Sequence, residues 1–226
     1  MKAENPARKP FVARGSGVKR CDGCRLPTDA CICQWRQLVA VECEFWLLTH
    51  HNELYKPTNT GRLILDSIAQ TRIFEWSRTE PSPDLLAALQ DERYSPCLVF
   101  PSGDDYAHRM LERVPGGERI PAFIILDGTW RQARRIFRHS RYLHHLPVIE
   151  PNRKRSSRYK LRRSTDDAHL CTAEVAIALL EQVGAREAAA HLEGYFERFN
   201  ERYIGSRRRW AKQERQQRHS GGGGTQ

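Results

Sequence analysis

The sequence predicts an α/β protein whose mostly parallel sheet is flanked by helices. Short apolar segments alternate along the chain with segments of helical periodicity, which is typical of such a sheet. Polar residues directly follow several of the apolar segments, and the carboxyl ends of parallel strands are where these sheets hold ligands. A compact group of four cysteines precedes the sheet and predicts a small metal-binding motif.

The individual elements follow from local pattern. Short apolar runs containing β-branched and aromatic residues predict buried strands, and apolar residues three or four apart predict helices. Ser82 followed by Pro83 is a preferred helix start, with a capping residue before a first-turn proline. The expected strands are 41–48, 71–76, 97–100, 123–126 and 146–149, and the expected helices are 60–69, 82–90, 130–137, 172–183 and 186–204.

Composition divides the chain into four parts. Residues 1–20 carry basic side chains and little apolar content, which predicts a flexible basic arm. Residues 21–40 hold the cysteine cluster, and residues 41–205 contain the alternating strands and helices. Residues 206–226 are first basic and then rich in glycine, which predicts a flexible tail.

Charge suggests a polyanionic partner. The chain has 37 Lys and Arg against 27 Asp and Glu, a formal net charge of +10. Such an excess is typical of nucleic-acid binding, although a well-solvated surface would also account for it. No apolar run reaches about 18 residues, and the basic N-terminus lacks the apolar core of a secretory signal. We therefore expect a cytoplasmic protein with reduced thiols, no membrane association and no obligatory protein partner.

The cysteine cluster has the spacing C-x2-C-x6-C-x-C. Two close pairs of thiolates can reach a tetrahedral zinc at about 2.3 Å, and four thiolates leave no open position for chemistry. We therefore expect a structural zinc; a chance cluster or a disulfide pair is the alternative, and a reducing compartment disfavours disulfides. The expected ligands are Cys21, Cys24, Cys31 and Cys33.

The segment Phe-Ile-Ile-Leu-Asp-Gly-Thr-Trp, residues 123–130, ends a predicted strand at a carboxylate. Asp127 then lies where such a sheet binds its ligand; alternatively, Asp127 or Thr129 simply caps the next helix. Each of the other polar segments also has an ordinary explanation as a cap or turn. Together they would line one edge of the sheet, as in a small-molecule pocket. These segments are 49–53, 56–62, 101–104 and 170–174.

Asp127-Gly128-Thr129-Trp130 resembles the D-x-T-W signature of the DTW-domain proteins. The cysteine spacing, Thr58-Asn59-Thr60-Gly61-Arg62 and Leu170-Cys171-Thr172-Ala173-Glu174 are similar to the family's other blocks and occur in its order. The last block is usually Leu-Ser-Thr-x-Glu-Ala, so Cys171 and Val175 depart from it by small or medium-sized replacements. The resemblance covers about residues 20–200.

The resemblance implies a tRNA-uridine aminocarboxypropyltransferase, with residues 41–205 as its catalytic domain. Such enzymes transfer the 3-amino-3-carboxypropyl group of S-adenosylmethionine to N3 of a uridine in tRNA and release methylthioadenosine. The resemblance also implies a SPOUT-like fold with a knotted cofactor-binding region. A SPOUT-like RNA methyltransferase and a non-catalytic zinc-containing RNA-binding adaptor are the alternatives.

Roles for individual residues follow from this chemistry. We expect Asp127 to take or share the N3 proton, most effectively if burial raises its pKa. Thr129 and Trp130 complete the expected catalytic set; Trp130 would shield the site or stack on a base, or else belong to the core. Arg62 would pair with the cofactor carboxylate or lie in solvent. The residues expected to bind S-adenosylmethionine are Thr60, Gly61, Arg62, Pro101, Ser102, Leu126, Leu170 and Thr172.

Basic residues are dense after Asp127. Arginines recur at helical spacing in the next predicted helix, and a second basic run with Tyr159 follows at 153–163. This density suits phosphate contacts with folded RNA, although charge runs are often solvated faces. The residues expected to bind RNA are Arg131, Arg134, Arg155, Arg158 and Lys160.

Overall fold

The computed structural model describes residues 18–152 and 170–220, with side chains as far as residue 212. Its centre is a six-stranded sheet of order β2-β1-β5-β3-β6-β4 in which every described pairing is parallel. The expected mostly parallel sheet is therefore confirmed, whereas the SPOUT-like relationship and the knot stay predictions. The strands are β1 (Glu44–His50), β2 (Thr71–Trp76), β3 (Tyr94–Val99), β4 (Met110–Leu111), β5 (Ile120–Asp127) and β6 (Val148–Ile149).

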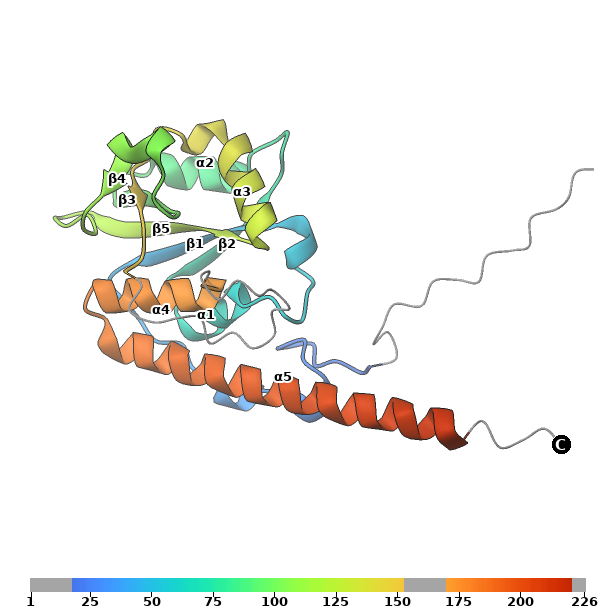
Figure 1. The fold of residues 1–226 in the computed structure, drawn as a ribbon. Coiled ribbons are helices and arrows are strands. Elements are labelled where there is room, and N and C mark those ends of the chain that lie inside the picture. Colours follow the sequence, from blue (N-terminus) through green and yellow to red (C-terminus); the bar gives the residue numbers. More distant parts are fainter. Residues whose placement is uncertain (1–17, 153–169, 221–226) are drawn as a thin grey trace, which may run out of the picture.

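Helices cover both faces of the sheet, which gives three layers (Figure 1). Successive side chains of a strand point to opposite faces, so Phe45 and Leu47 of β1 pack in one core and Trp46 and Leu48 in the other. The continuously apolar strands thus reflect burial on both sides. One face carries α1 (Gly61–Ser67), α4 (Thr172–Gln182) and α5 (Arg186–Ser220); the other carries α2 (Pro83–Gln90) and α3 (Trp130–His139).

The helix starts agree with local capping. Ser82 accepts a hydrogen bond from the Leu85 amide, with Pro83 in the first turn of α2 as expected. Thr129 caps α3 in a reciprocal arrangement with Gln132. In α4 the Glu174 side chain accepts from the Cys171 amide at 2.8 Å. Local sequence therefore determines where these helices begin.

One two-residue strand and the 3-10 turns were not predicted, because they show no strand or α-helix periodicity. They are β4 and the 3-10 turns η1 (Thr28–Ala30), η2 (Cys33–Trp35), η3 (His51–Glu53), η4 (Asp104–Arg109) and η5 (Arg141–Leu143). The turns η1 and η2 belong to the cysteine motif, which packs against α5.

The C-terminal helix is longer than expected. Its predicted end near residue 204 and the flexible tail from residue 206 are wrong for residues 206–220, which continue α5. The reason is that this segment is rich in Arg, Lys and Gln, which are good helix formers, and contains no Gly or Pro. Ser206 is also buried. The expected arm 1–17 and the glycine-rich residues 221–226 lie outside the described residues.

Within residues 18–152 and 170–220, no helix combines the length and the apolar character that crossing a membrane requires.

Candidate functional site

Asp127, the last residue of β5, joins three segments that are distant in sequence. Its Oδ2 accepts hydrogen bonds from Asn59 Nδ2 at 2.7 Å and from Thr49 Oγ1 at 3.1 Å. Its Oδ1 accepts from Thr172 Oγ1 at 2.8 Å. Thr49 is in β1, Asn59 precedes α1 and Thr172 begins α4, so the carboxylate connects the sheet edge to two helices. We call Asp127 and these three donors the hub.

The environment of Asp127 alters its acidity. The side chain is 2% exposed, and burial raises the pKa of its carboxyl above the ordinary value. Hydrogen bonds from Asn59, Thr172 and Thr49 oppose this shift by stabilising the charged form. A raised pKa makes the carboxylate a stronger base than an exposed aspartate, which is the property expected of Asp127 from the chemistry.

Asn59 and Gly61 adapt the start of α1 to this carboxylate. Asn59 Oδ1 accepts from the Arg62 amide at 3.0 Å while its Nδ2 reaches Asp127, so one side chain serves both the helix and the hub. At Gly61 a Cβ atom would lie 2.9 Å from Cγ and Oδ2 of Asp127. Glycine is therefore required by the close approach of the carboxylate.

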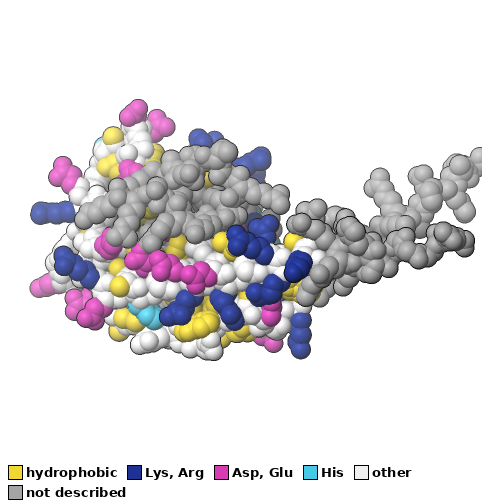
Figure 2. Space-filling view, turned by 60° about the horizontal axis from the view of Figure 1, so that its bottom comes forward, with side chains coloured by type: hydrophobic (Ala, Val, Ile, Leu, Met, Phe, Trp, Pro, Cys, Tyr) yellow, Lys and Arg dark blue, Asp and Glu magenta, His cyan; other side chains and the backbone are white. Residues whose placement is uncertain are grey.

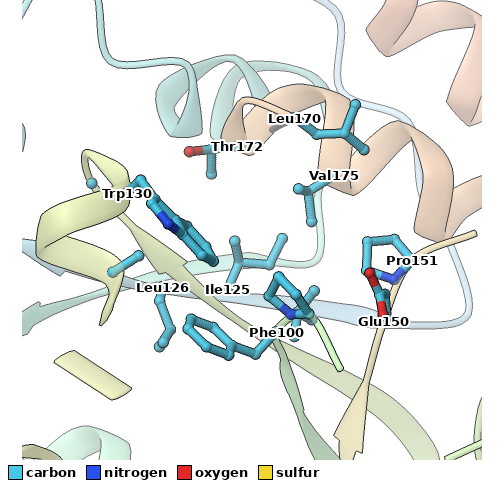
Figure 3. A pocket seen from close by; sticks show the side chains of 13 residues that line it. Phe100, Ile125, Leu126, Trp130, Glu150, Pro151, Leu170, Thr172 and Val175 are labelled. Carbon is cyan, nitrogen blue, oxygen red and sulfur yellow. The ribbon is translucent and has the colours of Figure 1, made fainter. Parts of the chain in front are cut away.

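An apolar pocket lies beside this hub, at the carboxyl ends of β3 and β5 (Figure 3). Its walls come from two strands, from the starts of α3 and α4 and from the segment after β6. Glu150 is the one charged side chain among its described lining residues. The lining residues are Val99, Phe100, Pro101, Ile125, Leu126, Gly128, Trp130, Ala133, Glu150, Pro151, Leu170, Thr172 and Val175.

One wall of the pocket is aromatic. Phe100 is stacked between Trp130, with ring centroids 5.4 Å apart, and Phe137, with centroids 4.2 Å apart. Tyr106 packs on Phe137 and donates its hydroxyl to the Pro101 carbonyl at 2.6 Å. Trp130 is thus both a wall of the pocket and a member of an aromatic cluster. Such a wall suits a flat ligand ring.

Glu150 adds a negative charge to the described lining of the pocket, which is otherwise mostly apolar. Its Oε2 accepts from the Ser102 amide at 2.9 Å, which ties the segment after β6 to the segment after β3. An apolar pocket with one carboxylate is complementary to a ligand that is largely apolar and carries a positive charge.

The structure brings only some of the predicted residues into the pocket. Trp130, Pro101, Leu126, Leu170 and Thr172 line it. Asp127 does not line the pocket but is hydrogen-bonded to Thr172, and Thr60 and Gly61 lie at the buried start of α1. The other three predicted residues have different contacts, as follows.

Thr129, Ser102 and Arg62 do not line the pocket. Thr129 is exposed and caps α3, so its contacts agree with the alternative interpretation, in which Thr129 is a helix cap. Ser102 contributes its amide to Glu150. The Arg62 guanidinium donates to the Gly23 carbonyl and lies 3.9 Å from Asp66, so it faces the cysteine motif. Its expected pairing with a cofactor carboxylate is not favoured by this orientation.

Two residues of the hub, Thr49 and Asn59, were not among the predicted site residues. Both belong to the polar segments that follow or precede predicted elements, and that position was the available signal. Glu150 was also missed, although it directly follows the predicted strand 146–149, and that position was again the available signal.

Of the predicted RNA-binding residues, the structure describes Arg131 and Arg134. Both are exposed on α3, together with Arg135 and Arg138. The helix begins at the pocket wall with Trp130, so this basic surface adjoins the pocket edge of the sheet. Arg155, Arg158 and Lys160 lie outside the described residues.

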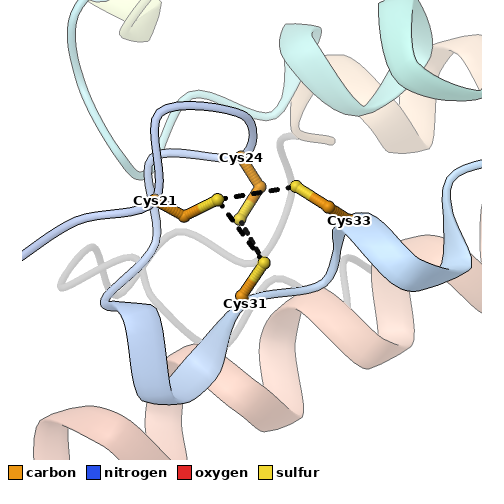
Figure 4. A group of neighbouring side chains, drawn as sticks. All are labelled: Cys21, Cys24, Cys31 and Cys33. Carbon is orange, nitrogen blue, oxygen red and sulfur yellow. Dashed lines mark hydrogen bonds between the residues drawn. The ribbon is translucent and has the colours of Figure 1, made fainter.

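The four cysteines of the N-terminal motif converge (Figure 4). Cys21 Sγ lies 3.6 Å from Cys33 Sγ and 3.5 Å from Cys31 Sγ, and Cys24 lies 3.8 Å from Cys31. A tetrahedral zinc with Zn–S bonds of about 2.3 Å requires S···S separations of about 3.8 Å. None of the seven cysteines is in a disulfide. The four sulfurs can therefore hold a metal ion, and their arrangement suits zinc.

The backbone of the motif is shaped for this convergence. A Cβ at Gly23 would lie 2.7 Å from Cys33 Sγ, so the turn needs glycine there. Arg25 has φ 58°, a left-handed conformation that reverses the chain just after Cys24. The Cys24 amide and the Cys31 thiol lower the pKa of Cys21 to about 7. A thiolate at this position is the form that binds metal.

Contacts attach the cysteine motif to the main domain. Arg62 and Arg36 both pair with the buried Asp66 of α1, Arg36 at 2.8 Å, and Arg62 also holds the Gly23 carbonyl. From α5, Arg209 pairs with Asp29 at 2.6 Å. The motif thus connects α1, whose start faces Asp127, to the last helix.

The chain is an α/β protein with an accessory cysteine motif, and its pocket lies where parallel sheets typically hold ligands, at the carboxyl ends of the strands and beside a buried carboxylate. Comparison with known proteins gives the family. The DTW domain matches residues 18–204, and the chain belongs to the DTW-domain family.

A curated relative from Macaca fascicularis is named tRNA-uridine aminocarboxypropyltransferase 2. It is 26% identical to this chain over 172 residues, which cover 72% of the chain and 56% of the relative. The chain thus spans little more than half the length of that relative. No solved structure matches the chain significantly.

Proposed function

We propose that this protein transfers the 3-amino-3-carboxypropyl group of S-adenosylmethionine to N3 of a uridine in tRNA. The observation that carries the proposal is the convergence of three side-chain donors, from segments distant in sequence, on Asp127, directly beside a mostly apolar pocket whose described lining includes one carboxylate. The name of the curated relative supports both the reaction and the tRNA substrate.

The pocket suits the proposed donor in shape and charge. S-adenosylmethionine carries a flat adenine and two positive groups, a sulfonium and an ammonium. The aromatic wall at Phe100 and Trp130 offers surface for the ring, and Glu150 offers a counter-charge for a cationic group. The pocket would hold the donor so that its γ carbon, and not its methyl group, faces the acceptor.

The donor supplies a γ carbon bound to a sulfonium, so the C–S bond breaks as the N3–C bond forms, and methylthioadenosine leaves. The N3 proton must go to a base. Asp127 does not line the pocket, but it accepts a hydrogen bond from the Thr172 hydroxyl, and Thr172 does line it. We assign the proton path from N3 to the Thr172 oxygen and from the Thr172 hydroxyl to Asp127.

The cysteine motif has a structural role in this proposal. Cys21, Cys24, Cys31 and Cys33 would hold zinc with no open coordination position, so the metal takes no part in the transfer. Its effect is to keep the motif folded against α1 and α5.

The test is to incubate the protein with S-adenosylmethionine and unmodified tRNA and to analyse both products. Mass spectrometry of the nucleosides should show aminocarboxypropyl-uridine, and methylthioadenosine should accumulate in equal amount. S-adenosylhomocysteine with a methylated nucleoside would instead indicate a methyltransferase. Absence of S-adenosylmethionine binding in calorimetry, with tRNA binding retained, would indicate the RNA-binding adaptor.

A further inference from the structure

Charge is divided unequally along α5. Residues 186–201 contain two basic and four acidic side chains, whereas residues 202–212 contain five basic side chains and no acidic one. Figure 2 shows Lys and Arg gathered toward the end of this face where the helix leaves the body, with Asp and Glu more frequent toward the other end. We call residues 202–212 the basic end of α5.

Part of the basic end is used to attach the cysteine motif. Arg202 donates to the Asp29 carbonyl and lies over the Trp35 ring, and Arg209 pairs with the Asp29 carboxylate. The other cations have no such role. Arg207, Arg208 and Lys212 are exposed, and within the described part of the chain their side chains have no ion pair or hydrogen bond.

The basic end lies on the same side of the molecule as the pocket. The start of α5, at Ala185–Ala188, lies near residues 119–121 at the beginning of β5, which is the amino edge of the sheet. Near the other end of the helix, Arg202 donates to the Asp29 carbonyl of the cysteine motif. The Gly23 carbonyl of the same motif accepts from Arg62, at the start of α1, and the start of α1 lies beside Asp127. Figure 1 shows α5 running beneath the sheet and extending past its carboxyl edge.

We propose that Arg207, Arg208 and Lys212 bind the phosphate backbone of the RNA whose uridine enters the pocket. This inference rests on the proposed function for the identity of the RNA as tRNA. Three cations without a partner among the described residues, on a helix that extends past the carboxyl edge of the sheet, are complementary to a polyanion, and contacts of this kind set affinity and orientation without reading sequence.

An anionic membrane fits this surface less well. Surface-bound helices insert large apolar side chains below their cationic ones. The exposed large apolar residues of the described chain all lie outside α5: Leu38, Tyr55, Leu65, Ile73, Leu86 and Ile120.

The experiment compares two triple variants that each remove three exposed arginine or lysine charges. The first is Arg207→Gln/Arg208→Gln/Lys212→Gln, in which glutamine preserves helix propensity. The matched control is Arg113→Gln/Arg119→Gln/Arg186→Gln, whose side chains are also exposed and without ion pairs in the described residues. Arg119 and Arg186 lie at the amino edge of the sheet, and Arg113 precedes Val114 of the same surface. Binding of unmodified tRNA is titrated at several salt concentrations.

We expect the first variant to bind tRNA roughly tenfold or more weakly at low salt, with a log–log salt slope reduced by about 0.7 to 0.9 for each lost phosphate contact. The control should keep most of the affinity and slope, and both variants should bind S-adenosylmethionine as the wild type does. If circular dichroism shows that the triple variant has lost helix, Arg207→Gln/Arg208→Gln is tested instead.

Equal slopes for the wild type and a folded variant would overturn the inference, as would a loss confined to binding of phosphatidylserine vesicles. Failure of the proposed function appears separately. In that case the wild type would bind tRNA in a salt-dependent manner through these residues but would form no modified uridine.

Discussion

The backbone of Gly61 faces the Asp127 carboxyl so closely that a Cβ would lie 2.9 Å from two of its atoms. Asp127 is 2% exposed and held by three donors, so it has no free space into which to move. The start of α1 and the end of β5 are therefore mutually dependent.

Gly61→Ala should lower stability by about 1–3 kcal/mol, because the new methyl group overpacks the site and displaces the carboxylate. Thermal unfolding measures this. The matched control is Gly194→Ala in α5, where a Cβ would meet nothing within 4 Å. That change should stabilise the protein by about 0.5–1 kcal/mol through helix propensity. Equal, small effects of the two substitutions would contradict the close approach at Gly61.

Thr172→Val and Thr49→Val separate proton transfer from structural support. Each removes one hydrogen bond to Asp127 without changing side-chain shape, and each should cost about 1–3 kcal/mol of stability. Only Thr172 lines the pocket. Single-turnover transfer should therefore fall about 10²-fold or more in Thr172→Val and much less in Thr49→Val. Equal losses of activity would assign Asp127 and both threonines to structure alone.

Asp127 should determine the acid limb of the pH profile. The carboxylate is the base, and burial raises its pKa above the ordinary value of 3.8. As pH falls through this raised pKa, the carboxyl is protonated and the path from Thr172 is blocked. The kcat/KM for transfer should thus decline at a higher pH than an ordinary aspartate would cause.

Asp127→Asn should lose about 10²–10⁴-fold of the transfer rate and also the acid limb. Asp91→Asn is the control. Asp91 precedes β3 at the amino edge of the sheet, away from the site, and pairs with the exposed Arg93, so its substitution should leave the profile unchanged. Near wild-type single-turnover rates in a folded Asp127→Asn protein would remove this residue from the chemistry.

Glu150→Gln should weaken binding of the cationic donor. The substitution keeps the shape of the side chain but removes the one charge of the described lining. The Kd for S-adenosylmethionine should therefore rise roughly three- to tenfold, while the Kd for uncharged methylthioadenosine stays nearly the same. Calorimetry measures both. Glu118→Gln, exposed at the amino edge of the sheet, is the control. A parallel loss for both ligands would show that Glu150 acts through its contact with Ser102 instead.

The cysteine motif should contain about one zinc per chain, and Cys21→Ser/Cys24→Ser should lose it. Because the motif is attached to α1 and α5, metal loss should also lower the thermal stability of the whole domain. Elemental analysis and thermal unfolding test the two statements. Asp22→Ser, an exposed position within the motif, should change neither. Metal-free protein of unchanged stability would show that the cluster is not a structural site.

Sequence by itself determined the class of the fold and the chemistry available to it. Apolar runs predicted five of the six strands, and the cysteine spacing predicted the cluster that the structure assembles. Capping pairs such as Ser82 with Pro83 predicted helix starts. These features are local: they depend on the period of a strand or helix and on residues within one turn of each other.

Only the tertiary structure decided which side chains meet. Thr172, Asn59 and Thr49 are 45, 68 and 78 residues from Asp127, and strand order together with the packing of α1 and α4 brings them to one carboxylate. The same packing turns Arg62 toward the cysteine motif. Periodicity reports how a segment folds, whereas contacts across a sheet edge depend on how distant segments are arranged, which no local pattern contains.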